Sequence, residues 1–258
     1  FPGNTVAHRL DPRTKILLVT LYIIALFSAK GWMGYAVMAV TLAACVKVSH
    51  VGLRALVRGL KPLVFIIAFT GILNMFFTPD THYLWEWGIL RVSVKGIENA
   101  LFMVIRIMLL VMGTFLMTYT TSPIRLTDGL ESLLNPLKKI HVPVHELAMM
   151  MAIALRFIPT LIEETDKIMS AQKARGADFD SGNIFQKAKA LVPILVPLFI
   201  SAFRRADELA TAMECRCYHG GEGRTKLHVL KYQRRDYVAL AGGVVILALV
   251  VVLRRLGA

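Results

Sequence analysis

Two long segments decide the fold of this chain: LAMMMAIALRFIPTLIEETDKIMSAQKARG (Leu147–Gly176) and NIFQKAKALVPILVPLFISAFRRADELATAMECRC (Asn183–Cys217). Each begins with apolar residues and gains acidic and basic residues toward its end. Turn signals are missing from their interiors apart from single prolines, and a single proline bends a long helix at a defined place. The pattern therefore predicts two long helices that are kinked at Pro159, Pro193 and Pro197.

Both predicted helices end at a tripeptide centred on arginine, and we call these tripeptides the arginine tips. They are Ala174, Arg175 and Gly176 in the first helix, and Cys215, Arg216 and Cys217 in the second. The helix macrodipole alone favours a single arginine at a C-terminus. Here two helices both end in an arginine that is flanked by small residues, which favours a further role. An unobstructed guanidinium offers a planar fork of donors to carboxylates. We therefore expect the tips to dock onto a soluble partner.

The composition of the chain is that of a membrane protein. Of its 258 residues 56% are hydrophobic and only 18% are charged, and the mean hydropathy is +0.59. In soluble domains about a quarter of all residues are charged. Apolar runs of membrane-spanning length recur along the sequence. The net charge of +13 is typical of a membrane protein whose Lys and Arg collect in cytoplasmic segments, which is a simpler explanation than nucleic-acid binding.

We expect an all-α polytopic membrane bundle of about five spans with a cytoplasmic region of three amphipathic helices. The expected spans are Ile16–Ala29, Trp32–Val46, Pro62–Phe77, Ile97–Thr118 and Tyr237–Leu253. The domains are then residues 1–121 with four spans, 122–236 with the cytoplasmic helices, and 237–258 with the last span. Basic residues collect in every second segment between the spans, and such segments face the cytoplasm. This predicts that the N-terminus and the 122–236 region are cytoplasmic.

The cytoplasmic region begins with a predicted amphipathic surface helix over Pro123–Leu137, whose leucines recur near period 3.6. The apolar parts of the two long helices are also candidates for spans. Charges and prolines interrupt them, however, and a hydrocarbon core needs about 20 apolar residues in a row. We therefore favour helices that pack beneath the bundle. Acidic residues are able to brace the pair by binding Lys167, Lys173, Arg204 or Arg205 across it; they are Glu163, Glu164, Asp166, Asp207 and Glu208.

Methionines give the first long helix a soft apolar surface. Met149, Met150 and Met151 are consecutive, and Arg156 and Pro159 follow within three turns. These methionines suit an ordinary core. They also suit a groove that re-packs around different partners, because the thioether side chain is flexible.

Within the fourth span, Arg106 lies among apolar residues, where an ionisable group faces the bundle interior. A structural hydrogen bond to a carbonyl or to Asn74 and a gating role are equally compatible with it.

The sequence contains no pattern for a resident cofactor or metal. Cys215, Cys217 and His219 resemble part of a zinc site, but a structural zinc ion needs four ligands and no fourth is evident. The glycine-rich run GGEGRTK (Gly220–Lys226) lacks the spacing of a phosphate-binding loop. We therefore expect no catalysis and no ATP site in this chain.

Several stretches together resemble the transmembrane T component of energy-coupling factor (ECF) transporters, a family related to the membrane subunit of cobalt and biotin uptake systems. The stretches are LDPRTK (Leu10–Lys15), Arg106, TSPIRLTDGLESLLNPLKKI (Thr121–Ile140), RFIPTLIEE (Arg156–Glu164), QKARGADF (Gln172–Phe179) and AMECRCYHGGEGRTKL (Ala212–Leu227). The resemblance covers almost the whole chain. The cysteines that flank Arg216 depart from the family pattern, which has Ala and Gly there.

The resemblance implies a non-catalytic coupling subunit of an importer for vitamins or other micronutrients in the bacterial cell membrane. Each arginine tip would dock into a groove of one of two ABC ATPase subunits, which form a heterodimer or a homodimer. The coupling helices would pass the movement of the ATPases to a membrane-embedded substrate-binding S component. The surface with Met149, Met150, Met151, Arg156 and Pro159 is our candidate for contact with that component.

Two other functions were weighed against this one. A self-sufficient permease needs a polar pocket at mid-membrane, and beyond Arg106 and Asn74 the spans offer few polar groups. A membrane-embedded enzyme needs a nucleophile with a base, or a metal cluster, near one membrane face. The sequence shows neither arrangement, so the coupling subunit is the better interpretation.

Overall fold

The computed structural model describes residues 5–77, 83–87, 90–177, 179, 183–220 and 229–256. The chain divides into two compact units. Unit 1 comprises Phe1–Leu133 and Val229–Ala258, and unit 2 is the stretch between them, Leu134–His228. Unit 2 is thus an insertion in the sequence of unit 1.

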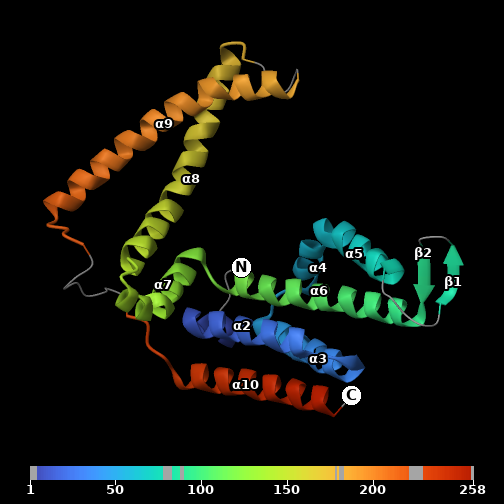
Figure 1. The fold of residues 1–258 in the computed structure, drawn as a ribbon. Coiled ribbons are helices and arrows are strands. Elements are labelled where there is room, and N and C mark those ends of the chain that lie inside the picture. The colour runs from blue at the N-terminus through green and yellow to red at the C-terminus, as the bar shows by residue number, and fades with distance from the viewer. Residues whose placement is uncertain are drawn as a thin grey trace. The chain divides into compact units, whose positions relative to one another are not determined.

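Unit 1 is a bundle of helices with one short hairpin (Figure 1). Its elements are α1 (Val6–Arg9), α2 (Pro12–Ser28), α3 (Gly31–Ser49), α4 (Leu53–Leu60), the 3-10 helix η1 (Lys61–Leu63), α5 (Val64–Phe77), β1 (Tyr83–Trp87), β2 (Leu90–Ser93), α6 (Val94–Thr120), α7 (Pro123–Leu134) and α10 (Arg234–Arg255). The antiparallel β1–β2 hairpin joins α5 to α6 and pairs Trp85 with Val92.

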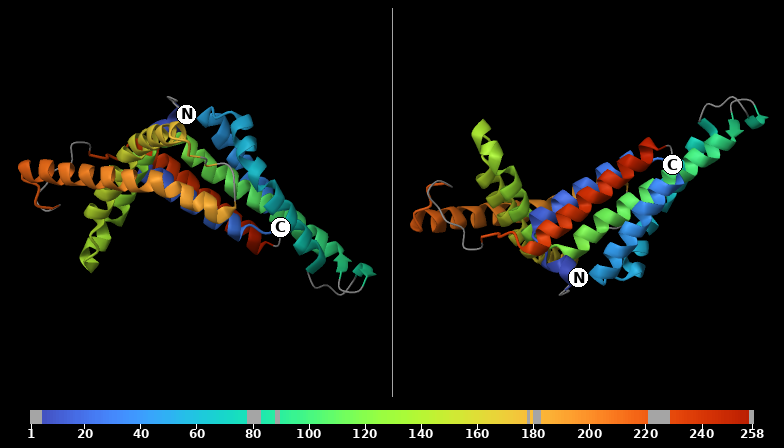
Figure 2. Two further views of the ribbon diagram at one scale, coloured as in Figure 1. Left: turned by 90° about the horizontal axis from the view of Figure 1, so that it is seen from above. Right: turned by 90° about the horizontal axis from the view of Figure 1, so that it is seen from below.

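The core of unit 1 lies where α2, α3, α6 and α10 pack on one another. Figure 2 shows α2 and α10 side by side along their lengths. Leu26, Met38 and Val250 are fully buried there. Small residues allow close helix packing in a membrane, and Gly113 of α6 is one of them, because a Cβ at this position would lie 2.5 Å from the ring of Tyr22.

Unit 2 contains the 3-10 helix η2 (Asn135–Ile140) and two long helices, α8 (Val144–Ala174) and α9 (Ile184–Cys215). Both long helices continue through their internal prolines, Pro159 in α8 and Pro193 and Pro197 in α9. Figures 1 and 2 show α8 and α9 crossing each other. The expected pair of long, crossing helices is therefore present.

The structure confirms an all-α polytopic membrane protein, and each predicted span coincides with a helix: α2, α3, α5, α6 or α10. Six helical stretches of the described residues are long and apolar enough to cross a membrane: Gly31–Ser49, Leu53–Phe76, Val94–Thr120, Val144–Ala174, Phe185–Cys215 and Arg234–Arg255. Helix α2, with 17 residues, is not among them. Because α8 and α9 meet this criterion by length and composition, their place beneath the membrane stays a prediction, as do the domain limits 1–121, 122–236 and 237–258.

The predicted surface helix Pro123–Leu137 was too long by one turn. Helix α7 ends at Leu134, and the chain continues as η2. Pro136 explains the change, because proline lacks a backbone N–H and disfavours the α conformation of the residue before it, Asn135.

Candidate functional site

The first arginine tip is the C-terminus of α8, closed by a Schellman motif. The backbone N–H of Gly176 donates to the carbonyl of Lys173 at 3.0 Å, and that of Ala177 donates to the carbonyl of Gln172 at 3.0 Å. Gly176 has a φ of +86°, the left-handed conformation that this motif requires. Arg175 occupies the C-cap with a φ of −84°. The glycine therefore ends the helix and leaves the arginine at its very tip.

The second arginine tip repeats this motif at the end of α9. Cys217 N–H donates to the carbonyl of Glu214 at 2.8 Å, and Tyr218 N–H donates to that of Met213 at 3.0 Å. Cys217 takes the position of Gly176, with a φ of +55°. Arg216 therefore stands at the same position relative to its helix as Arg175. The cysteines that depart from the family pattern keep the backbone geometry.

All six tip residues are exposed. A Cβ added at Gly176 would have no neighbour within 4 Å, so space around that tip is open. The C-terminal ends of α8 and α9 lie apart from each other in unit 2 (Figure 1). Each guanidinium is thus presented at a separate helix end, where it is able to meet a carboxylate on another molecule.

Replacing Cys217 by glycine should stabilise the second tip. A non-glycine residue in the left-handed region costs about 1–2 kcal/mol, and glycine adopts it without that penalty. We expect Cys217→Gly to raise the thermal midpoint of the detergent-solubilised protein slightly, without loss of partner binding. The matched change, Gly176→Cys, should lower the midpoint. A lower midpoint for Cys217→Gly would contradict the strained conformation at this position.

An ion pair connects the two long helices within unit 2. Arg205 of α9 donates to the carboxylate of Glu164 of α8, with 2.8 Å between Nη2 and Oε2. This is one of the pairings expected from the sequence. Both side chains are partly exposed, so the pair adds little stability, but it links α8 to α9 along the stretch where they meet.

The candidate coupling surface lies on α8. Met150 and Met151 are 55% and 42% exposed, and Met149 is half-buried. Arg156 and Pro159 are also exposed. Leu147, Ile158 and Ile162 extend the exposed apolar surface along the same helix. Met150 and Met151 are therefore exposed within unit 2, and their contact with another component stays a prediction.

Arg106 of α6 is held by Tyr35 of α3. Its Nε and Nη2 donate to Tyr35 Oη at 2.9 and 2.5 Å. Its guanidinium also lies 5.7 Å from the ring centres of Phe27 and Tyr35. The sequence suggested a backbone carbonyl or Asn74 as the partner of a structural Arg106, and the structure gives the hydroxyl of Tyr35 instead. Tyr35 was missed because the two residues are 71 positions apart.

Sequence reasoning also missed a polar cluster at the start of α2, which we call the anchor cluster. It consists of Asp11, Arg13, Lys15, Ser132, Tyr232 and Asp236, all in unit 1. Arg13 pairs with Asp11 at 3.0 Å, donates to Ser132 Oγ at 3.2 Å, and lies 4.1 Å from the ring centre of Tyr232. Lys15 Nζ donates to the Thr120 carbonyl at 2.8 Å.

Asp236 is the most buried member of the anchor cluster, with 1% of its surface exposed. Its Oδ1 accepts from the Asp11 N–H and its Oδ2 from the Gln233 N–H, both at 2.8 Å. On the other side, Gly129 of α7 lies so close to Pro12 that a Cβ would approach its Cβ to 3.0 Å. The start of α2 therefore holds both α7, where the chain leaves unit 1, and the start of α10, where the chain returns.

In the described residues, no group of three or more His, Cys, Asp or Glu side chains lies close enough together to hold a metal ion. Cys215 and Cys217 are free, exposed thiols. The fold thus assigns these two cysteines to the helix end, where Cys217 takes part in the Schellman motif.

Comparisons with known proteins identify the family of this chain. The family model for CbiQ, described as a cobalt transport protein, matches residues 3–227. The energy-coupling factor transporter transmembrane protein EcfT of Ruminiclostridium cellulolyticum is 51% identical over 252 residues, which are 98% of this chain and 94% of the relative. The EcfT proteins of Thermosediminibacter oceani and Bacillus subtilis are 56% and 47% identical, over 92% and 98% of this chain and 89% and 96% of the relatives.

These matches extend over nearly the full length of both chains and agree with the multi-pass helical fold. The chain therefore belongs to the CbiQ/EcfT family of transporter transmembrane components.

Proposed function

We propose that this chain is the coupling subunit of an ECF-type importer for a vitamin or another micronutrient. It passes an ATP-driven conformational change from two ABC ATPase subunits to a membrane-embedded, substrate-binding S component. The observation that carries the proposal is the pair of equivalent arginine tips, in which Arg175 and Arg216 stand at the same position of the same helix-ending motif. The subunit has no catalytic role of its own, and its partners hydrolyse the ATP.

Two equivalent tips fit two ATPase subunits. A docking groove that recognises an arginine at a helix end needs carboxylate acceptors and room for the helix. Both tips fit such a groove in the same way, because their Schellman motifs have the same pattern of backbone hydrogen bonds. The separate ends of α8 and α9 in unit 2 then allow each tip to engage its own subunit (Figure 1).

The exposed apolar residues of α8 suit the S component. Met150 and Met151 offer flexible side chains that adapt to the shape of an apolar partner. Arg156 and Pro159 lie on the same helix, between these methionines and Glu164, where α8 is joined to α9. A movement of the arginine tips would therefore reach this surface through rigid helices.

We place the protein in the bacterial plasma membrane, with the N-terminus and unit 2 on the cytoplasmic side. The basic segment between α3 and α5 and the basic residues before α10 support this orientation, because Lys and Arg collect on the cytoplasmic side of membranes. Arg106 serves the bundle itself, since Tyr35 binds its guanidinium.

Reconstitution tests the proposed function. The chain, the ATPase pair and one S component are placed together in liposomes, and uptake of the labelled substrate is measured with ATP inside or outside. We expect uptake only when all partners and ATP are present. Vesicles that lack one partner at a time are the controls. Uptake by this chain alone would instead establish a self-sufficient permease and would overturn the proposal.

A further inference from the structure

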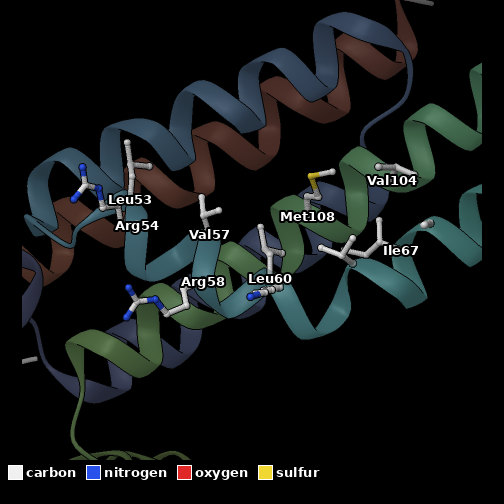
Figure 3. A pocket seen from close by; sticks show the side chains of 11 residues that line it. Leu53, Arg54, Val57, Arg58, Leu60, Ile67, Val104 and Met108 are labelled. Carbon is white, nitrogen blue, oxygen red and sulfur yellow. The ribbon is translucent and has the colours of Figure 1, made fainter.

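A groove of about 860 Å³ lies between α4, α5 and α6 in unit 1 (Figure 3). Eight of the side chains that line it are apolar, among them Val57, Ile67 and Met108, and three are basic: Arg54, Arg58 and Lys61. The arginine tips and the α8 surface belong to unit 2, so the proposed coupling function uses none of these residues.

Two of the three basic residues lie at one end of the groove. Figure 3 shows Arg54 and Arg58 toward that end, with their guanidinium groups apart from each other, and Val104 and Ile67 toward the other end. Arg54 and Arg58 are four residues apart on α4 and so share a helix face. All three basic residues are exposed. In the described part of the chain no carboxylate forms an ion pair with any of them, and residues 47–61 contain no acidic residue at all.

The apolar end of the groove extends along a membrane span. Lys61 stands at the start of η1, and Ala68 lies seven residues further, which is about 10 Å along the helix axis. Val104 and Met108, from the middle of α6, form the opposite wall. Val94–Thr120 and Leu53–Phe76 are both long and apolar enough to cross a membrane, and the three basic residues lie in the first nine residues of Leu53–Phe76. The groove thus runs from basic residues near one end of this stretch toward its apolar middle.

We propose that this groove binds one anionic phospholipid, such as a phosphatidylglycerol. Its phosphate contacts Arg54, Arg58 and Lys61, and an acyl chain lies along Val57, Ile67 and Met108. Guanidinium groups bind phosphate through paired, charge-assisted hydrogen bonds. Basic pockets beside membrane helices on the cytoplasmic side are suited to anionic headgroups. A free phosphate would leave the apolar wall uncovered, and a zwitterionic lipid would bring a fourth cation to a rim that already has three.

Native mass spectrometry of the full-length chain tests this site. The protein is released from micelles that contain equal amounts of phosphatidylglycerol and phosphatidylcholine with matched acyl chains. We expect the wild-type chain to retain phosphatidylglycerol over phosphatidylcholine by roughly tenfold, a preference of the size that a few charge-assisted contacts give. An equal retention of the two lipids would overturn the proposal.

Three variants separate a built site from general charge attraction. Arg54→Gln with Arg58→Gln should remove the preference. Arg254→Gln with Arg255→Gln makes the same charge change at exposed residues of α10 and should preserve it. Ala68→Phe fills the apolar part of the groove, leaves the rim charged, and should also remove the preference.

Each remaining outcome counts against the lipid. A preference that survives Ala68→Phe would show that surface charge alone holds the headgroup. A preference lost equally in the α10 control would show that net charge decides it. If the Arg54, Arg58 double variant keeps the lipid but no longer retains the small membrane partner during co-purification, the groove binds protein.

Discussion

Reversal of charge at both arginine tips, in an Arg175→Glu, Arg216→Glu double variant, should abolish recovery of the ATPase pair and abolish transport. Each glutamate would place a negative charge where we propose that a carboxylate groove receives a guanidinium. Like charges placed against each other oppose association, and loss of one central arginine commonly weakens a complex by about 30-fold or more. Because the tips are exposed and lie at helix ends of unit 2, the bundle of unit 1 should stay folded and inserted.

A matched control makes the same change of charge on α9 alone. Lys187→Glu with Arg204→Glu alters two exposed basic residues of α9 that lie away from its tip. We expect this control to retain the ATPases. Arg175→Lys and Arg216→Lys should each retain part of the binding, because lysine keeps the charge and loses the planar fork.

The measurement is co-purification of both ATPase subunits on tagged chain, with monodispersity by size exclusion as the test of folding. Full recovery of the ATPases by the double glutamate variant would refute the docking role of the tips. Recovery of one ATPase by each single variant would instead assign one subunit to each tip.

The tips were predictable because their signals are local. Gly176 directly follows Arg175, and a glycine after a charged helical run is typical of a helix end. The second tip offers no such glycine, and Cys217 gave no reason to expect a positive φ. Only the structure shows that both helices end in the same Schellman motif.

The spans were predictable for a similar reason, since apolar runs identify membrane helices without tertiary information. The position of α8 and α9 relative to the membrane was harder to predict, because each helix has an apolar first part and a charged second part. Their length and mean hydropathy are those of spans, whereas Arg156 and Glu164 argue for contact with water. Composition alone does not decide between these two effects.

The contacts of the bundle interior were beyond sequence reasoning. Arg106 meets Tyr35 across 71 residues, and Asp236 meets Asp11 across 225. Nothing in the local pattern connects such pairs. The motif LDPRTK carries part of the resemblance, and its long-range contacts appear only when the start of α2 is seen between α7 and α10.

The anchor cluster has a consequence for coupling. Unit 2 is inserted in the sequence between α7 and α10, so the chain enters and leaves it through these two connections. Arg13 contacts Ser132 on the first connection and Tyr232 on the second. One residue therefore contacts both connections, and we propose that the start of α2 holds them in place when the coupling helices move.

Removal of the Asp236 carboxylate should destabilise this cluster more than any other single change in it. In Asp236→Ala the backbone N–H groups of Asp11 and Gln233 lose their acceptor. The Asp11 N–H is buried and the Gln233 N–H is partly buried. A buried donor without a partner costs about 1–3 kcal/mol, so the two together should cost roughly 3 kcal/mol. For a chain of this size that is a drop of roughly 6–12 °C in the thermal midpoint.

Differential scanning fluorimetry of the purified chain in detergent measures this drop, and two variants make it specific. Asp207→Ala removes an exposed carboxylate of α9 and should leave the midpoint unchanged. Asp236→Asn keeps one acceptor oxygen and turns the other into a donor, so its midpoint should fall between those of Asp236→Ala and the wild type. If Asp236→Ala melts with the wild type, then Asp236 does not hold α2 to α10, and Arg13 alone would have to join the two connections of unit 2.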